Sequence, residues 1–105
     1  MKKQERQERL NKVLTVEGKK FSKKVTDKVV KVYGKTGGFI TRLLEDGDGD
    51  LQLDIRRFYE DNDGNWAPTG KGIRIKLETS RQLLRTLRQL KKDLEEQQLW
   101  DEYLP

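Results

Sequence analysis

The sequence predicts an α+β fold in which a four-stranded antiparallel sheet is followed by a C-terminal helix. Two patterns and the chain length predict this fold. Between residues 29 and 77, runs of β-branched and aromatic residues alternate with turns rich in glycine, aspartate and proline. From residue 81 to residue 103 there is no glycine or proline, and leucines recur at intervals of three and four. The 105 residues amount to about one small domain.

The four strands are separated by turn-rich segments. Leu51, Leu53 and Ile55 alternate with polar residues, which is the pattern of a half-buried strand. The acidic residues 45–50 are expected to form the turn before this strand, and residues 60–70 are expected to form the loop after it. The expected strands, in meander order, are residues 29–33, 39–44, 51–59 and 72–77.

Thr79 or Ser80 is expected to cap the N-terminus of the helix. Leucines form one stripe along the helix, with Arg and Lys on its other faces, and part of the stripe is expected to cover the sheet. Beyond residue 28, only 27 of 77 residues are apolar, which is little for a stable monomer. We therefore expect the stripe to be a homodimer seam as well. The residues of this seam are Leu83, Leu87, Leu90 and Leu94.

The composition excludes most catalytic chemistry. The chain has no cysteine, which excludes disulfides, thiolate metal ligands and a cysteine nucleophile. It has no histidine, which excludes a Ser-His-Asp triad and a histidine general base. We expect a protein that is not an enzyme and that binds no cofactor and no metal. Apolar runs of at most two residues fall far short of a membrane span of about 20, so we expect an intracellular protein without membrane contact.

A calcium site at Asp46, Asp48 and Asp50 is not supported by the spacing. An EF-hand loop needs glycine at its sixth position and glutamate at its twelfth. Here those positions are Leu51 and Arg57. The acidic residues are expected to form a flexible turn instead.

The net charge of +5 is concentrated at the N-terminus. Residues 1–28 carry ten Lys and Arg and four acids, whereas the remaining residues carry thirteen and fourteen. With seven apolar residues and no sustained stripe, residues 1–28 are expected to form a basic, flexible arm. Such arms bind nucleic acid, and the alternative is a solubilising extension.

Two stretches suggest a family. They are residues 54–59 (Asp-Ile-Arg-Arg-Phe-Tyr) and residues 68–73 (Pro-Thr-Gly-Lys-Gly-Ile), joined by an acidic turn and followed by a leucine-striped helix. This order resembles the positive cofactor four family, transcriptional coactivators with a C-terminal single-stranded DNA-binding domain and with prokaryotic and viral relatives. The resemblance covers roughly residues 29–96 and is specific between residues 54 and 75. The acidic turn at 45–50 departs from the family, whose members carry lysines there.

The resemblance implies a curved antiparallel sheet, dimerised through the helices, with single-stranded DNA lying along the sheet. The family residues that face DNA map onto Arg56, Tyr59 and Lys71. Lys35 and Arg42 correspond to two further basic positions of the family.

The residue types support this interpretation independently. Non-specific binding of single strands needs cations that follow the phosphates and rings on which bases stack. Arg74 adds a cation and Trp66 a ring, although Trp66 is equally suited to packing in its loop. By strict alternation Tyr59 lies on the face of Leu51, and Arg56 lies on the other. For both to contact one ligand, the strand must bend or carry a bulge.

The C-terminal residues combine acids with aromatic rings. Residues 93–105 carry five acids and no base, interleaved with leucine, tryptophan and tyrosine. Three roles stay open: recruiting a replication or transcription protein, masking the DNA groove, or packing in the dimer. The residues concerned are Trp100, Asp101, Glu102 and Tyr103.

We therefore expect a basic arm (1–28), a single-stranded DNA-binding domain (29–98) and an acidic-aromatic tail (99–105). The expected function is non-sequence-specific binding of single-stranded DNA in replication, recombination or transcription, and RNA is a further candidate ligand. The expected location is with nucleic acid, in the nucleus of a eukaryote or in the cytoplasm or nucleoid of a prokaryotic or viral system. The alternatives are a protein-interaction adaptor for replication or transcription machinery and a chaperone of duplex DNA or RNA that binds through the basic arm.

Overall fold

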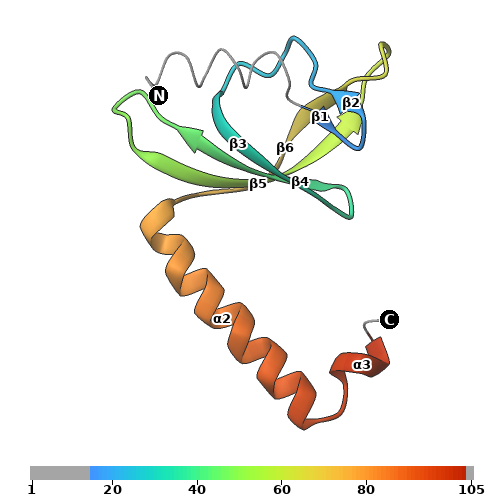
Figure 1. Ribbon diagram of the computed structural model, residues 1–105, viewed down its shortest axis with the longest axis vertical. Coiled ribbons are helices and arrows are strands. Elements are labelled where there is room, and N and C mark those ends of the chain that lie inside the picture. Colours follow the sequence, from blue (N-terminus) through green and yellow to red (C-terminus); the bar gives the residue numbers. More distant parts are fainter. Residues whose placement is uncertain (1–14, 104–105) are drawn as a thin grey trace.

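The computed structural model describes residues 15–103 of the chain, apart from the side chain of Tyr103. Four antiparallel strands form one sheet in the order β3-β4-β5-β6, and the helix α2 follows directly (Figure 1). This confirms the predicted four-stranded antiparallel sheet and C-terminal helix. The strands are β3 (Lys28–Thr36), β4 (Phe39–Glu45), β5 (Leu51–Glu60) and β6 (Trp66–Lys76), and the helix is α2 (Leu77–Glu96).

β6 is longer than predicted because it contains an irregularity. The pairing passes from Arg56 opposite Gly72 to Phe58 opposite Pro68, so that β6 carries two extra residues at this point. Pro68 is tolerated because β6 is an edge strand, where a missing N–H leaves no partner unsatisfied. The residues from Trp66 to Gly70, predicted to lie in a loop, therefore belong to the sheet.

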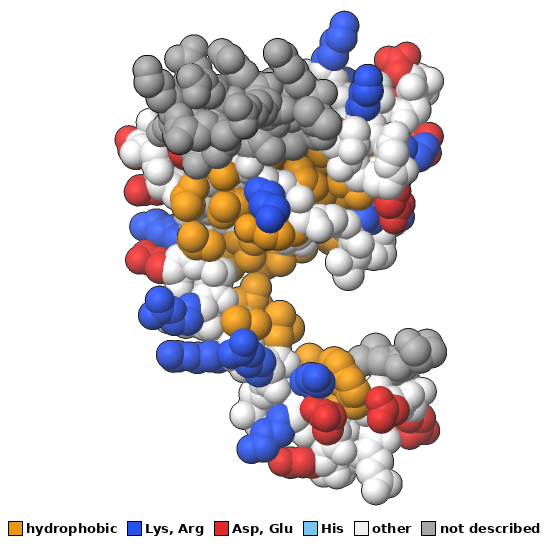
Figure 2. All heavy atoms as spheres, in the orientation of Figure 1, with side chains coloured by type: hydrophobic (Ala, Val, Ile, Leu, Met, Phe, Trp, Pro, Cys, Tyr) orange, Lys and Arg blue, Asp and Glu red, His pale blue; other side chains and the backbone are white. Residues whose placement is uncertain are grey.

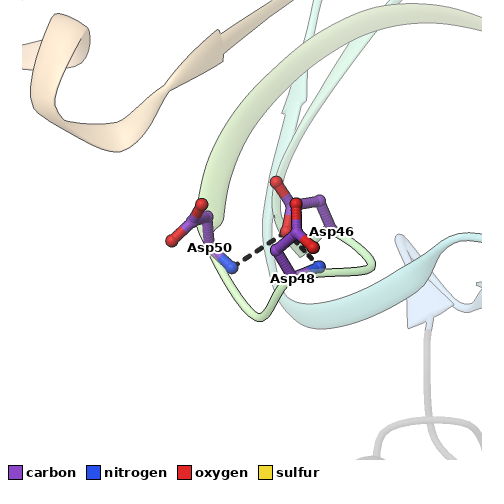
Figure 3. A group of neighbouring side chains, drawn as sticks. All are labelled: Asp46, Asp48 and Asp50. Carbon is purple, nitrogen blue, oxygen red and sulfur yellow. Dashed lines mark hydrogen bonds between the residues drawn. The ribbon is translucent and has the colours of Figure 1, made fainter.

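The two acidic turns have the same construction. Asp46 Oδ1 accepts the backbone N–H groups of Asp48 and Asp50, both at 2.9 Å (Figure 3). In the next turn, Asp61 Oδ1 accepts the N–H groups of Asp63 and Asn65 at the same distances. One carboxylate oxygen from each of Asp46, Asp48 and Asp50 lies within 4.8 Å of the other two, and closure of the turn accounts for this arrangement.

Residues 15–25 cover one face of the sheet. β1 (Thr15–Val16) and β2 (Lys19–Lys20) form a hairpin, and Val16 is buried in the core with Ile40 and Phe58. Phe21 packs edge-on against Phe58, with ring centroids 5.4 Å apart. Part of the segment expected to be a flexible arm thus packs on the sheet, because it supplies the apolar side chains that this face needs. The predicted domain limits at residues 28 and 98 stay predictions, and residues 1–14 lie outside the described part.

The opposite face of the sheet is left open in the single chain. Leu53 and Ile55 are only half-buried, and Ile73 on the neighbouring strand is exposed. α2 runs away from the sheet and has no buried residue, so its leucines do not cover this face (Figure 1). The expectation that the helix covers its own sheet was therefore wrong, and two apolar surfaces lack an intramolecular partner.

Both ends of α2 differ from the predicted ones. The helix begins after Lys76, which makes no side-chain capping bond, so Thr79 and Ser80 lie inside its first turn. It ends at Glu96, where Leu99 N–H bonds to Leu94 O at 2.8 Å across a left-handed Gln98. The short helix α3 (Trp100–Tyr103) follows. Neither helix of the described part has the length and apolar character needed to cross a membrane.

Candidate nucleic-acid interface

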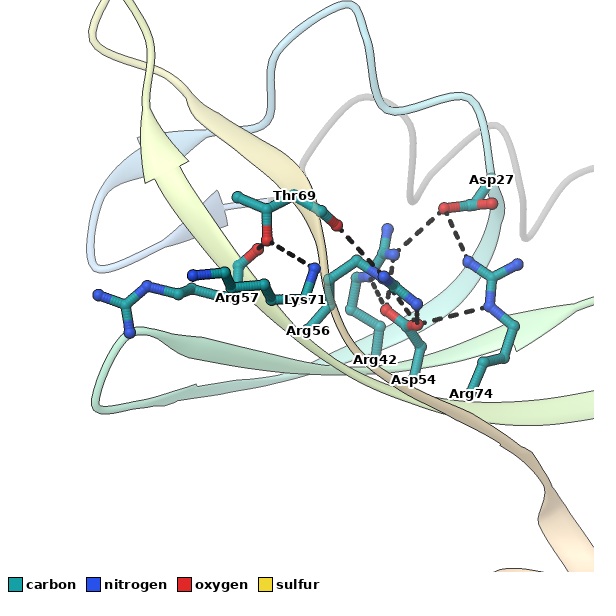
Figure 4. A network of polar contacts seen from close by, with 8 residues as sticks. All are labelled: Asp27, Arg42, Asp54, Arg56, Arg57, Thr69, Lys71 and Arg74. Carbon is teal, nitrogen blue, oxygen red and sulfur yellow. Dashed lines mark hydrogen bonds and ion pairs between the residues drawn. The ribbon is translucent and has the colours of Figure 1, made fainter.

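Three arginines surround Asp54 at the middle of the sheet (Figure 4). Arg42 contacts Asp54 Oδ2 through Nη2 at 2.7 Å, and Arg56 contacts Oδ1 through Nη2 at 3.0 Å. Arg74 reaches Oδ1 at 3.4 Å. Asp27 completes the cluster, with ion pairs of 3.2 Å to Arg42 and 3.3 Å to Arg74. We call these five residues the Asp54 network.

The strand register brings this network together. Arg42, Asp54 and Arg74 lie directly opposite one another on β4, β5 and β6, so their side chains share one face. The side chains of Arg42 and Asp54 are both 0% exposed. Burial raises the pKa of the Asp54 carboxyl, but hydrogen bonds from Arg42 and Arg56 and their positive charges outweigh burial and hold that pKa below its ordinary value.

The three arginines of the Asp54 network differ in how far they are exposed to a ligand. Arg42 is fully buried, with its guanidinium 5.0 Å from the Phe58 ring centroid, and it offers no surface to a ligand. Its Nη1 has no hydrogen-bond partner. Arg56 and Arg74 keep side-chain exposures of 17% and 37%. Arg42, a sequence candidate for DNA contact, therefore lies in the interior, whereas the other two reach the surface at the edge of the network.

Arg56 and Tyr59 do not share a face. β4 and β5 pair without a register shift up to Arg57, so side chains alternate regularly along β5. Phe58 is buried in the core on the face of Asp54 and Arg56. Arg57 and Tyr59 therefore lie on the other face, and both are exposed. The irregularity that could have brought Arg56 and Tyr59 together lies on β6 and leaves the alternation of β5 intact.

Lys71 lies in the irregular part of β6, next to Arg57. Thr69 Oγ1 donates to Arg57 O at 2.8 Å and accepts the N–H of Lys71 at 3.1 Å, so one hydroxyl links the two cationic residues. In Figure 4 both side chains extend away from the Asp54 network. Gly72 allows β6 to approach β5 closely at this point, because a Cβ at its position would collide with the carbonyl oxygen of Ile55.

Phe39 completes the exposed group. The guanidinium of Arg57 lies 5.9 Å from the Phe39 ring centroid. If Gly38 carried a Cβ, that atom would lie only 2.9 Å from Nη1 of Arg57. The glycine thus leaves room for the arginine at the β3–β4 turn. Tyr59 and Phe39 are 44% and 37% exposed. We call Phe39, Arg57, Tyr59 and Lys71 the cation–aromatic surface. Phe39 and Arg57 are not among the contact residues predicted from the sequence, although the i, i+2 spacing of Arg57 and Tyr59 indicates that the two share a face.

Trp66 and Lys35 belong to a separate contact with the hairpin. Trp66 Nε1 donates to Val16 O at 3.2 Å, and the ammonium groups of Lys19 and Lys35 lie 5.7 and 5.5 Å from its ring. Lys35 also pairs with Glu17 at 3.7 Å. The ring of Trp66 is thus engaged within the fold, and Lys35 is exposed beside it.

The C-terminal segment is built around Trp100. Its ring is half-buried, and the ammonium of Lys91 on α2 lies 5.4 Å from the ring centroid. Asp101 and Glu102 are exposed on α3. Tyr103 ends α3, and its side chain lies outside the described part. Trp100 therefore packs on α2, whereas Asp101 and Glu102 face solvent.

These features define a small antiparallel-sheet module with a projecting helix and a charged, ring-bearing surface. Residues 49–86 match the family model of the Transcriptional Coactivator p15 (PC4), a non-catalytic family of DNA-binding coactivators. The match confirms the resemblance inferred from sequence, and the family in general binds single-stranded DNA. It spans β5, β6 and the first half of α2, and so includes Arg57, Tyr59 and Lys71. A search of curated proteins found no match.

Proposed function

We propose that this chain binds single-stranded nucleic acid, with little sequence preference, through the cation–aromatic surface. The observation that carries the proposal is the position of Arg57 and Tyr59 on one face of β5, with Lys71 linked to Arg57 through Thr69. Cations follow the phosphates, and exposed rings stack on any base at about 1–3 kcal/mol each. Arg57 and Lys71 supply the cations, and Tyr59 and Phe39 supply the exposed rings.

Arg56 and Arg74 have a secondary role in this proposal. The Asp54 network contains three arginines and two aspartates, so it keeps one excess positive charge near the surface. Its main work is to hold β4, β5 and β6 in register. Lys35 lies on β3 beside the hairpin, where it pairs with Glu17 at 3.7 Å, and it is not part of the cation–aromatic surface. The proposed role is to hold melted strands during replication, recombination or transcription inside the cell.

The proposed functional unit is a homodimer. Leu87 and Leu90 on α2 are each 51% exposed, and the open face of the sheet presents Ile73 and its apolar neighbours. Figure 2 shows hydrophobic side chains gathered over the sheet and along the side of α2 that faces it. A second copy brings a helix with the same stripe, and the two copies can cover each other's apolar surfaces. Leu83 and Leu94, which are half-buried, complete the seam.

A direct comparison of ligands tests the proposal. We expect a mixed-sequence single-stranded DNA of about 20 nucleotides to bind more tightly than the matching duplex at moderate salt, with a log–log salt slope of about −0.7 per neutralised phosphate. Equal affinity for the two forms would contradict the proposal and favour binding by cations outside the cation–aromatic surface, such as those of the basic N-terminal residues. A single-stranded RNA of the same sequence shows whether the 2′-hydroxyl alters the affinity.

The acidic end of the chain supports a second candidate function, that of an adaptor. Asp101 and Glu102 project into solvent beside the half-buried Trp100, an arrangement that suits docking to a basic surface of a replication or transcription protein. Deleting residues 99–105 separates the roles of this tail. Tighter DNA binding would indicate that the tail masks the groove, and loss of the dimer would indicate packing. Loss of a partner alone would indicate recruitment.

A further inference from the structure

α2 carries a row of cations that the cation–aromatic surface does not use. Arg81, Arg85, Arg88 and Lys92 follow one another at intervals of four, three and four residues. At about 100° per residue, the four positions fall within an arc of about 60°. All four residues are exposed. We call them the α2 ridge. At about 1.5 Å per residue, the ridge is about 16 Å long.

The residues of the α2 ridge form no ion pair within the described part of the chain. The ion pairs there lie in the hairpin and the sheet. Neighbouring like charges three and four residues apart destabilise a helix. An external polyanion would remove this repulsion.

The ridge lies away from the proposed dimer seam. On the same helical projection, its centre is about 160° from the centre of the stripe formed by Leu83, Leu87, Leu90 and Leu94. Figure 2 shows hydrophobic side chains on the side of α2 that faces the sheet, with Lys and Arg side chains along its other side. A second copy that covers the leucines therefore leaves the ridge open to solvent.

The chemistry of the ridge indicates which polyanion it suits. α2 has no aromatic residue, so the ridge offers no ring on which an unpaired base could stack. A ligand would be held by its phosphates alone. A duplex carries one charge per about 1.7 Å of its axis, so about ten phosphates pass along the length of the ridge, twice the density of one strand. We propose that the α2 ridge binds the phosphate backbone of double-stranded nucleic acid, as a second site that does not depend on the cation–aromatic surface.

A charge-matched pair of variants tests this second site in the full chain. R85Q/R88Q removes two ridge cations, and K23Q/K24Q removes two exposed cations that make no ion pair in the described structure. The binding of a labelled duplex of about 20 base pairs is measured by fluorescence anisotropy over a range of salt concentrations. For R85Q/R88Q we expect at least about tenfold weaker duplex binding at low salt and a log–log slope shallower by about 1.8. For K23Q/K24Q we expect a clearly smaller change.

Further arms of the experiment make the outcome decisive. R85K/R88K keeps the charges and is expected to bind the duplex like the unmodified chain, and circular dichroism reports whether the helix is intact in each variant. Duplex binding by R85Q/R88Q that equals that of K23Q/K24Q would overturn the inference. An equal loss for single strand and duplex would overturn the assignment to duplex. Failure of the unmodified chain to bind single strands would instead overturn the proposed function. The comparison of duplex binding between R85Q/R88Q and K23Q/K24Q would still test the α2 ridge.

Discussion

Arg56 and Arg57 are adjacent in sequence but lie on opposite faces of β5. Arg56 turns toward Asp54, at 3.0 Å, and also donates to Thr69 O at 3.2 Å. Arg57 lies over the Phe39 ring and, like Tyr59, is exposed. Arg56 therefore mainly stabilises the sheet, whereas Arg57 is available to a ligand.

This division predicts different effects for two alanine variants. Arg57→Ala is expected to weaken binding of single-stranded DNA and to make the log–log salt slope shallower by about 0.7, because one phosphate contact is lost. Its free energy of unfolding is expected to stay close to that of the unmodified chain. Arg56→Ala is expected to lower the free energy of unfolding, since it removes a hydrogen-bonded partner of Asp54. Anisotropy titrations and urea denaturation of both variants measure the two effects. Stronger loss of DNA binding in Arg56→Ala at unchanged stability would contradict this division.

The order of the strands and turns could be predicted from the sequence, because glycine and aspartate clusters separate the β-rich segments. The start of β6 could not, since Pro68 and the two extra residues resemble a loop. The end of α2 could not be predicted either, because the left-handed position after a helix is usually glycine and here it is Gln98.

The buried face was the main feature that alternation misassigned. The alternation of Leu51, Leu53 and Ile55 with polar residues predicts that the leucine and isoleucine side of the strand is the buried one, yet Asp54 on the other side is fully buried. Alternation shows that a strand has two faces but does not say which packing partner covers each of them. The hairpin around Val16 covers the face that carries Asp54. In our proposal, a second copy of the chain covers the face that carries Leu53 and Ile55. The burial of Arg42 could not be foreseen, because it depends on pairing with Asp54.

Removing the charge of Asp54 is expected to destabilise the fold strongly. Asp54→Asn leaves the buried Arg42 with Asp27, at 3.2 Å, as its remaining counter-ion, and breaking a buried pair from one side costs about 3–5 kcal/mol. Urea denaturation measures the loss. Asp48→Asn, at an exposed turn position, is the matched control and is expected to change the stability little. A loss below about 1 kcal/mol for Asp54→Asn would show that the network does not hold the sheet together.

Asp54 also predicts a pH dependence. Its pKa is lower in the folded chain than the ordinary value of 3.8. As the pH falls through that ordinary value, the unfolded chain binds a proton that the folded chain does not, so the stability contributed by Asp54 is lost. The contribution is fully present above the ordinary pKa and disappears as the pH falls through the folded pKa. Urea midpoints at about pH 6 and pH 3 are expected to differ less for Asp54→Asn than for the unmodified chain. Equal differences would contradict the lowered pKa.

The proposed dimer is tested at the leucine stripe. Leu87→Glu places a charge in the centre of the seam and is expected to convert the dimer to a monomer, because an unpaired carboxylate is costly to bury. Gln82→Glu makes the same change in charge away from the stripe and is expected to leave the dimer intact. Sedimentation equilibrium measures the mass of each variant. A monomeric unmodified chain, or a dimer unaffected by Leu87→Glu, would rule out this seam.

The central claim is that exposed rings and cations of β5 and β6 hold a single strand, and Tyr59 tests it most directly. Titration of a labelled single-stranded 20-mer compares Tyr59→Ala with Tyr59→Phe, which keeps the ring. Loss of one stacked base is worth about 1–3 kcal/mol, so the account predicts about 5- to 150-fold weaker binding for Tyr59→Ala and nearly unchanged binding for Tyr59→Phe. Unchanged affinity in Tyr59→Ala, with Lys71→Ala equally without effect, would contradict it.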